Sequence, residues 1–185
     1  INNNTTLQNG GGMNAVWSNP TLLNVTISNN EATWLGGGGL DLEYSSNPTI
    51  TNSIIWGNDM YADGSIPIIN YSNIEGDENG YCLPDNLCGS ANQSECLEFI
   101  ELGWCSEWII TNPTNLNTDP MFTDPENGDY TLQANSPCID TGTAYYEIDG
   151  EVILDMDESE YSGMAPDMGA FEWKLEIELG DLNAD

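Results

Sequence analysis

The chain has 185 residues, with 31 Asp and Glu, one Lys and no Arg or His, so its formal net charge at pH 7 is −30. Because phosphate groups are bound by Lys and Arg, this charge excludes nucleic acid as a natural partner and disfavours an anionic membrane surface. The sequence contains no apolar run of the length that spans a bilayer, so we expect no membrane insertion, and the chain is long enough for one domain with a sizeable core.

Residues 1–75 contain an internal repeat. Residues 10–30 recur within residues 36–58, at an offset of 27 that becomes 28 after the insertion of one residue. A shorter third copy follows at an offset of 19, in which Pro67 corresponds to Pro48. Self-similarity at a fixed period in this range is typical of architectures built from stacked repeats.

The repeat predicts short strands separated by sharp corners. Its equivalent apolar positions are Leu22, Ile50 and Ile69, and then Ile27, Ile55 and Ile74. Asn24 and Asn52 fall between two strands, where Asn adopts the left-handed conformation of a corner and can hydrogen-bond to the Asn of the next turn. Gly runs at 10–12 and 36–39 indicate another corner, open to positive φ. Three short strands and three corners per turn predict an all-β parallel β-helix.

Three stretches of the sequence resemble a known superfamily: NPTITNSIIWGN at 47–58, DPMFTDPENGDYTLQANSPCIDTG at 119–142 and PDMGAFEW at 166–173. They look like the C-terminal part of secreted bacterial right-handed β-helix proteins of the pectate-lyase-like superfamily. The resemblance implies a right-handed solenoid over residues 1–173. It leaves the function open, because that superfamily includes lyases, hydrolases, adhesins and surface proteins.

The first strand of each turn carries the candidate catalytic residues. Alternation along residues 13–17 and 40–44 predicts that Met13, Ala15, Trp17, Leu40, Leu42 and Tyr44 point inward. The alternate residues then point outward, with Asp41 over Asn14 and Glu43 over Val16 on neighbouring strands. Two adjacent carboxylates are the minimum for glycoside hydrolysis, so Asp41 and Glu43 are candidates. The alternative is that both are solvated acids on a sheet face.

Residues 76–112 interrupt the repeat and predict an excursion from it. They contain four cysteines, Cys82, Cys88, Cys96 and Cys105. We expect two disulfides, preferably 82–88 and 96–105, although spacing alone does not determine the connectivity. Zinc is the weaker alternative because the chain lacks His and tight Cys-x-x-Cys pairs, and free thiols are the other. Disulfides imply an extracellular or cell-surface location.

The C-terminal third predicts turns, acidic loops and a cover for the end of the solenoid. Cys138 is expected to be a buried, unpaired thiol. Pro, Asn and Gly predict a turn at 124–130, and residues 143–173 read as an acidic loop followed by the end cover. Carboxylates on turns are hard oxygen ligands, so Ca²⁺ is the expected cofactor. The two candidate clusters are Asp124, Glu126 and Asp129, and Asp149, Asp155 and Asp157.

Residues 174–185 are interpreted as a linker or the start of a following module. The sequence GDLNAD at 180–185 resembles the opening of a dockerin-type calcium loop, which implies ligand roles for Asp181, Asn183 and Asp185. A polar tail without a metal is an equal interpretation. The chain also starts at Ile1 in what reads as the end of a strand, so we expect either upstream coils of the same protein or another copy to cover that edge. The alternating residues 175–179 are the candidate strand for head-to-tail filaments.

The residue types present restrict catalysis severely. Without His, no Ser-His or Cys-His nucleophile can form. Polysaccharide lyases on the resembled fold use a basic residue with calcium, and Lys174 lies outside the predicted coils. A glycoside hydrolase based on carboxylates alone is therefore the only plausible enzyme class.

Two functions remain as expectations. The first is an extracellular structural, surface or adhesive module with no catalysis of its own. The second is a fragment of a carbohydrate-binding or carbohydrate-degrading protein, with polysaccharide as its ligand and its active site in upstream coils. A face that combines stacked acids with exposed aromatic residues would favour the second function, whereas a flat, uniform face would favour the first.

Overall fold

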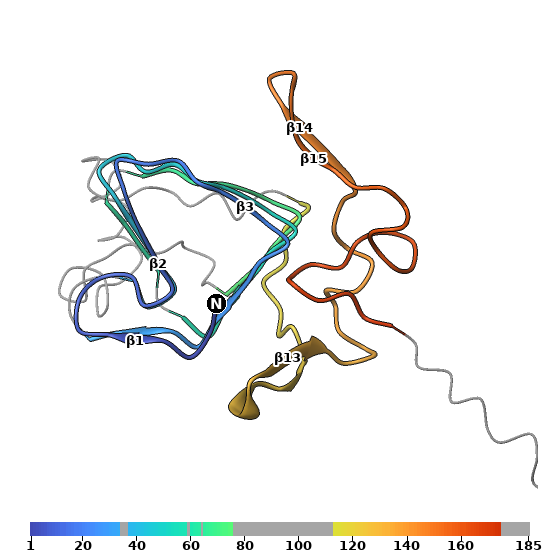
Figure 1. Cartoon of the computed structure of the whole chain (residues 1–185), viewed down its shortest axis with the longest axis horizontal. Helices are drawn as coiled ribbons and strands as arrows, with labels where there is room; N and C mark the ends of the chain where they lie inside the picture. The colour runs from blue at the N-terminus through green and yellow to red at the C-terminus, as the bar shows by residue number, and fades with distance from the viewer. Residues whose placement is uncertain (34–36, 59, 64, 76–112, 175–185) are drawn as a thin grey trace, which may run out of the picture.

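The computed structural model describes residues 1–33, 37–58, 60–63, 65–75 and 113–174 (Figure 1). These residues form strands and turns, and their one helical element is the short 3₁₀ helix Pro125–Asn127. The all-β class predicted from the sequence is confirmed. The four clustered cysteines at 82–105 and the dockerin-like residues at 181–185 lie outside the described residues. No helix in the described part of the chain is both long and apolar enough to cross a membrane.

The first part of the chain winds through three successive turns, which Figure 1 shows stacked behind one another. The first turn contains β1 (Thr5–Thr6), β2 (Met13–Val16), β3 (Thr21–Leu23) and β4 (Thr26–Ser28). The second contains β5 (Glu31–Ala32), β6 (Leu40–Glu43), β7 (Thr49–Thr51) and β8 (Ile54–Trp56). The third contains β9 (Met60–Asp63), β10 (Ile68–Asn70) and β11 (Asn73–Ile74). The two-stranded sheet β1-β5 and the three-stranded sheets β2-β6-β9, β3-β7-β10 and β4-β8-β11 are all parallel.

Two columns of aliphatic side chains form the centre of these turns. Leu22 pairs with Ile50 and Ile50 with Ile69, and the second column is Ile27, Ile55 and Ile74 in the same order. All six side chains are at most 7% exposed, as the repeat predicted. Burial of each such side chain contributes about 1.5–3 kcal/mol, so the repeated apolar positions account for the stacking.

The predicted Asn corner is present, but its hydrogen bonds differ from the expectation. Asn24 and Asn52 have φ values of 51° and 50°, and Tyr71 takes the same place in the third turn with φ of 48°. The prediction that Asn24 and Asn52 bond to each other is wrong. Asn52 instead exchanges two hydrogen bonds with the backbone of Thr143, at 2.7 and 2.8 Å.

Hydrogen bonding between turns occurs at other Asn positions. The amide oxygen of Asn58 accepts from the backbone N–H of Asn30 at 2.8 Å, and that of Asn30 accepts from the N–H of Asn4 at 3.1 Å. Asn19 and Asn47 form a second such contact, at 2.7 Å. These side chains satisfy backbone donors at corners, where no strand pairing is available.

Glycine is required at the corner with the Gly runs mainly because neighbouring turns approach each other closely, and less because of positive φ. Of the described residues at 10–12 and 37–39, Gly10 alone has positive φ, at 65°. A Cβ on Gly39 would lie 2.6 Å from the Cβ of Asn58, and one on Gly12 would lie 2.6 Å from the carbonyl oxygen of Gly39. Successive turns therefore pack too closely here for any side chain.

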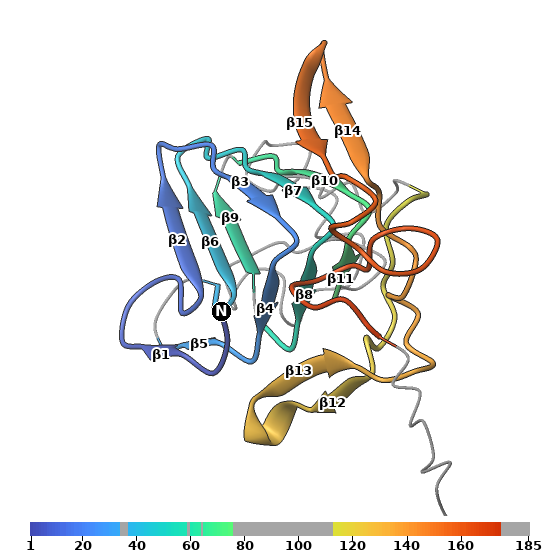
Figure 2. The ribbon, with the colours of Figure 1, turned by 45° about the vertical axis from the view of Figure 1, so that its right-hand side comes forward.

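The chain after residue 112 forms two antiparallel hairpins. Strands β12 (Phe122–Asp124) and β13 (Asp129–Leu132) are joined by the predicted turn, in which Gly128 has φ of 85°. Strands β14 (Tyr145–Ile148) and β15 (Glu151–Asp155) form the second hairpin, which projects away from the stacked turns (Figure 2).

Residues 143–173 occupy a different place from the end cover predicted for them. The N–H of Gly169 donates to the carbonyl of Asn52 in the second turn at 2.8 Å, and that of Ala170 donates to Thr26 in the first turn at 3.0 Å. The segment therefore lies along the flank of the stack. Leu116 instead pairs with the third described turn, exchanging backbone hydrogen bonds of 2.9 Å with Ser72 and Ile74.

A second core joins the stack to the C-terminal segments. It contains Ile54 from β8 together with Phe122, Tyr130, Leu132, Cys138 and Met168. Cys138 is fully buried and forms no disulfide, as predicted. Burial raises the pKa of its thiol to about 11, so the thiol stays protonated and unreactive at physiological pH.

Candidate functional site

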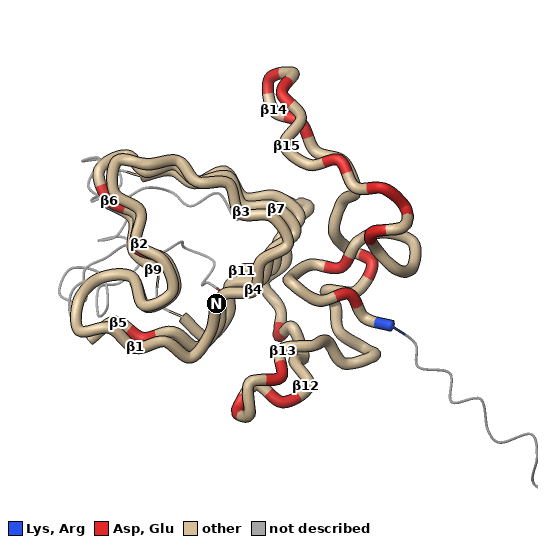
Figure 3. Tube along the Cα trace, viewed as in Figure 1, with Lys and Arg blue, Asp and Glu red and all other residues tan. Residues whose placement is uncertain are grey.

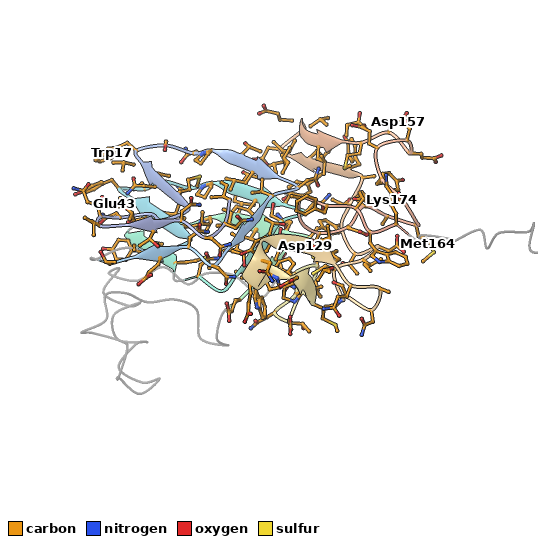
Figure 4. The ribbon with its side chains drawn as sticks, turned by 60° about the horizontal axis from the view of Figure 1, so that its bottom comes forward. Trp17, Glu43, Asp129, Asp157, Met164 and Lys174 are labelled. Atoms are coloured by element: carbon orange, nitrogen blue, oxygen red, sulfur yellow. The ribbon has the colours of Figure 1, made fainter. Side chains whose placement is uncertain are left out.

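The outer face of the sheet β2-β6-β9 contains the two carboxylates considered for catalysis. Asp41 lies between Asn14 of β2 and Tyr61 of β9, and Glu43 lies beside Val16. The predicted registers of Asp41 with Asn14 and of Glu43 with Val16 are therefore confirmed. Figure 4 shows Glu43 near Trp17 at one end of the molecule.

Asp41 is enclosed, contrary to the expectation of a solvated acid. Its side chain is 0% exposed, and neither carboxylate oxygen has a hydrogen-bond partner in the described part of the chain. Burial, and secondarily the charge of Glu43, raises the pKa of Asp41 to about 7. A buried, unpartnered carboxylate favours its neutral form because charge is costly to remove from water.

The connection between β1 and β2 lies over this face. A Cβ on Gly10 would be 2.7 Å from the Cβ of Asn14, so the loop backbone rests directly against β2. The amide of Asn9, in the same loop, donates to Glu43 Oε1 at 2.5 Å. Glu43 is half-buried and keeps a second carboxylate oxygen for other contacts. Sequence periodicity placed these acids on the correct face but does not predict the contact of this loop with Glu43.

Trp17 and Tyr44 form an exposed aromatic pair beside these acids. Their rings stack with centroids 5.2 Å apart and planes 9° apart, and they are 75% and 49% exposed. The prediction that both point inward is wrong. Each residue lies just past the end of its strand with φ of 53° or 55°, which ends the strand's alternation and turns the side chain outward. The repeat offset of 27 between these two aromatic residues was the signal for the stack.

This geometry does not provide a hydrolytic pair. A glycosidase needs one carboxyl group at the leaving oxygen and the other at the opposite side of the sugar ring. Asp41 cannot touch a substrate while its side chain is fully buried. Glu43 and the aromatic pair are accessible, and they suit binding better than bond cleavage.

The first predicted calcium cluster lies in the β12–β13 hairpin. Asp124 accepts from the amide of Asn127 at 2.8 Å, and Asp129 accepts from the hydroxyl of Thr131 at 2.6 Å. Each carboxylate is thus turned toward its own local partner. Among the described residues, no group of three or more His, Cys, Asp or Glu is arranged to hold a metal ion.

The second predicted cluster is spread along the other hairpin and the loop after it. Asp149 lies in the turn of the hairpin and Asp155 at the far end of β15. The strand between them is about 13 Å long at roughly 3.3 Å per residue, well beyond the span of one ion's ligand shell. Asp157 accepts from the N–H of Ser159 at 3.0 Å. Figure 3 shows that acidic residues gather on these C-terminal segments.

Comparison with models of known protein families, with curated proteins and with solved structures finds no match to this chain. The function is therefore inferred from the residues of the site.

Proposed function

We propose that the chain is the C-terminal part of a secreted right-handed parallel β-helix protein of the pectate-lyase-like superfamily, and that it is an extracellular module that adheres to polysaccharide. The repeat, the parallel sheets and their in-register pairing support the architecture. The absence of Lys and Arg from the stacked turns supports a neutral ligand over an anionic one.

The exposed stack of Trp17 on Tyr44 is the observation that carries this proposal. An aromatic ring held rigidly at the surface offers a flat apolar face to the C–H side of a sugar ring at little cost in side-chain entropy. The carboxylate of Glu43, on the same flank, accepts hydrogen bonds from sugar hydroxyls. Stacked aromatic residues beside acids distinguish this flank from the uniform face expected of a passive rod.

Two other functions follow from different premises. A structural rod would use upstream coils or a second copy of the chain as its partner, in head-to-tail contact. A carbohydrate-degrading enzyme would carry its active site on upstream coils and use this flank for binding. The adhesive function is preferred because it needs only residues that are present and accessible.

Binding to a panel of neutral and acidic polysaccharides tests the proposal by affinity electrophoresis and calorimetry. Trp17→Ala and Tyr44→Ala are expected to weaken binding of the retained polysaccharide at least tenfold, because aromatic stacking is lost. Tyr145→Ala is the matched control, since Tyr145 is 48% exposed, close to the exposure of Tyr44, but lies on the β14–β15 hairpin. Equal retention of all three variants and the parent protein would show that the aromatic pair is not the binding surface.

A further inference from the structure

A cavity of about 370 Å³ lies where the stacked turns meet the β12–β13 hairpin. Figures 1 and 2 both show this hairpin beside the sheet β4-β8-β11. From the stack the cavity is lined by Ser28, Asn29, Trp56 and Gly57. The hairpin side contributes the polar side chains of Asp119 and Gln133 beside Met121, Phe122 and Pro125. It is separate from the aromatic pair and from Asp41.

The side-chain amides of Asn29 and Gln133 both use their NH₂ groups in hydrogen bonds within the protein. The hydroxyl of Tyr130 donates to Asn3 at 3.0 Å, so the 3.1 Å contact of Tyr130 with Asn29 must be a donation from the Asn29 NH₂. The NH₂ of Gln133 donates to the carbonyl of Phe122 at 2.8 Å, and a carbonyl can only accept. The amide oxygens, Asn29 Oδ1 and Gln133 Oε1, accept no hydrogen bond from any other described residue, so both can accept from a ligand.

The remaining polar groups of the lining are also acceptors. One carboxylate oxygen of Asp119 accepts from the N–H of Met121 at 2.8 Å, and its other oxygen has no partner among the described residues. The hydroxyl of Ser28 already donates to the carbonyl of Trp56 at 2.7 Å. Glu75 adds a second carboxylate next to the cavity, where it accepts from the N–H of Gly57.

No cation of the chain neutralises this cavity. The single Lys, Lys174, lines a different cavity beside Trp173 and Asp140. The N-terminal ammonium of Ile1 donates to the carbonyl of Thr26 at 2.8 Å. The cavity thus combines an indole ring, two amide oxygens and an uncompensated carboxylate.

We propose that this cavity binds an alkylammonium or guanidinium group. Asp119 supplies a charge-assisted hydrogen bond, the two amide oxygens accept the other N–H groups, and the face of Trp56 attracts the cation through its quadrupole. Gly57 allows the Asn29 amide to pack directly against the backbone at the cavity wall, because a Cβ there would clash with Asn29 Oδ1. The net charge of −30 attracts cations and repels anions at longer range.

Titration of the whole chain with n-butylammonium, ethylguanidinium and n-butanol tests this inference by calorimetry and saturation-transfer NMR. The two cations are expected to bind with an affinity that falls as salt rises, and butanol, of the same length but uncharged, at least tenfold more weakly. Equal binding of butanol and butylammonium would overturn the proposal, and this comparison needs no variant.

Asp119→Asn is expected to weaken binding of both cations about tenfold, because it removes the charge and keeps the size and the acceptor for Met121. Asp129→Asn is the matched control on the same hairpin, because it makes the same charge change outside the cavity lining, and it is expected to change the affinity less than twofold. Equal losses of cation affinity in the two variants would show that only the overall charge of the protein attracts the cations. That result would overturn the proposed site.

The source of the cation is distinguished with a terminally blocked Gly-Lys-Gly peptide. Binding of this peptide as tightly as butylammonium assigns the site to a lysine side chain of a partner protein. Binding of butylammonium alone assigns it to a small free amine. Both results support the cation site. Failure of the aromatic-pair variants to affect polysaccharide binding would leave this site unaffected, since none of its lining residues is shared.

Discussion

Asp41 is the residue whose surroundings differ most from those of an ordinary surface acid. Its carboxyl group has a pKa of about 7 in the folded protein against an ordinary value of 3.8, because it is buried and lies near Glu43. The folded chain therefore binds this proton more tightly than the unfolded chain. Its contribution to the free energy of unfolding is greatest below pH 4 and decreases as the pH rises from about 4 to 7.

Asp41→Asn is expected to raise the free energy of unfolding at pH 8 by roughly 1–3 kcal/mol, because it removes a buried charge that lacks partners. The introduced amide would also face Asn14 on β2, where two amides can hydrogen-bond. Urea unfolding of both proteins at pH 4.5 and 8 measures the effect, and the gain should shrink at the lower pH. A gain of equal size at both pH values would contradict the buried-charge explanation.

Asp129→Asn is the control for this experiment. Asp129 is exposed, and hydrogen bonds from Thr131 lower the pKa of its carboxyl group. Its contribution is present at neutral pH and decreases as the pH falls, so the variant is expected to lose stability at pH 8 and not at low pH. The two substitutions should therefore have opposite signs at pH 8.

Cys138 provides a second prediction at the residue scale. Because its thiol is fully buried with a pKa raised to about 11, a polar thiol reagent at pH 8 is expected to leave it unmodified in the folded protein. In the denatured, unreduced protein the reagent should label one thiol per chain, if the other four cysteines form the expected disulfides. Labelling of five thiols, measured by intact mass, would show that those disulfides do not exist.

At the scale of elements, the Asn contacts between turns connect the strands. Asn58 accepts from Asn30 at 2.8 Å and donates to the carbonyls of Ile27 and Trp56, each at 2.9 Å. Asn58 is 9% exposed, so water cannot replace these bonds. The same corner therefore holds two turns of the chain together through one side chain.

Asn58→Ala is expected to lower the free energy of unfolding by about 3 kcal/mol, because it leaves buried donors and acceptors without partners. Asn47→Ala is the matched control, since Asn47 accepts from the N–H of Ile66 at 2.6 Å in an exposed contact. Water can replace that bond, so the expected loss is less than about 1 kcal/mol. Thermal unfolding followed by circular dichroism compares the two variants. Similar losses in the free energy of unfolding would contradict the explanation that burial makes the Asn58 hydrogen bonds irreplaceable by water.

At the scale of the whole molecule, self-repulsion of 30 net negative charges opposes folding. Salt screens this repulsion, so the melting temperature is expected to rise by several degrees between about 10 mM and 0.5 M NaCl. Calcium at millimolar concentration should stabilise the protein further if any carboxylate group binds it only in the folded state. A melting temperature that a chelator leaves unchanged at about 0.15 M NaCl would contradict the expected calcium cofactor.

The repeat by itself determined the stacked part of the fold. Leu22 and Ile50 hold the same place in two copies of the repeat. This predicted their pairing, because in-register parallel strands place equivalent residues over one another. Asn24 and Asn52 predicted the corner for an equally local reason, since few residues other than Asn and Gly adopt its left-handed conformation.

The tertiary structure alone decided the character of the candidate site. Asp41 is fully buried although strand alternation directs it outward, and on the same face Asn9 contacts Glu43, a contact between segments far apart in the sequence. Trp17 points outward because the chain turns at the end of β2, where strand alternation no longer applies. Residues 143–173 lie along the flank because their hydrogen bonds reach Asn52 and Thr26, and no local pattern encodes partners so distant in the sequence.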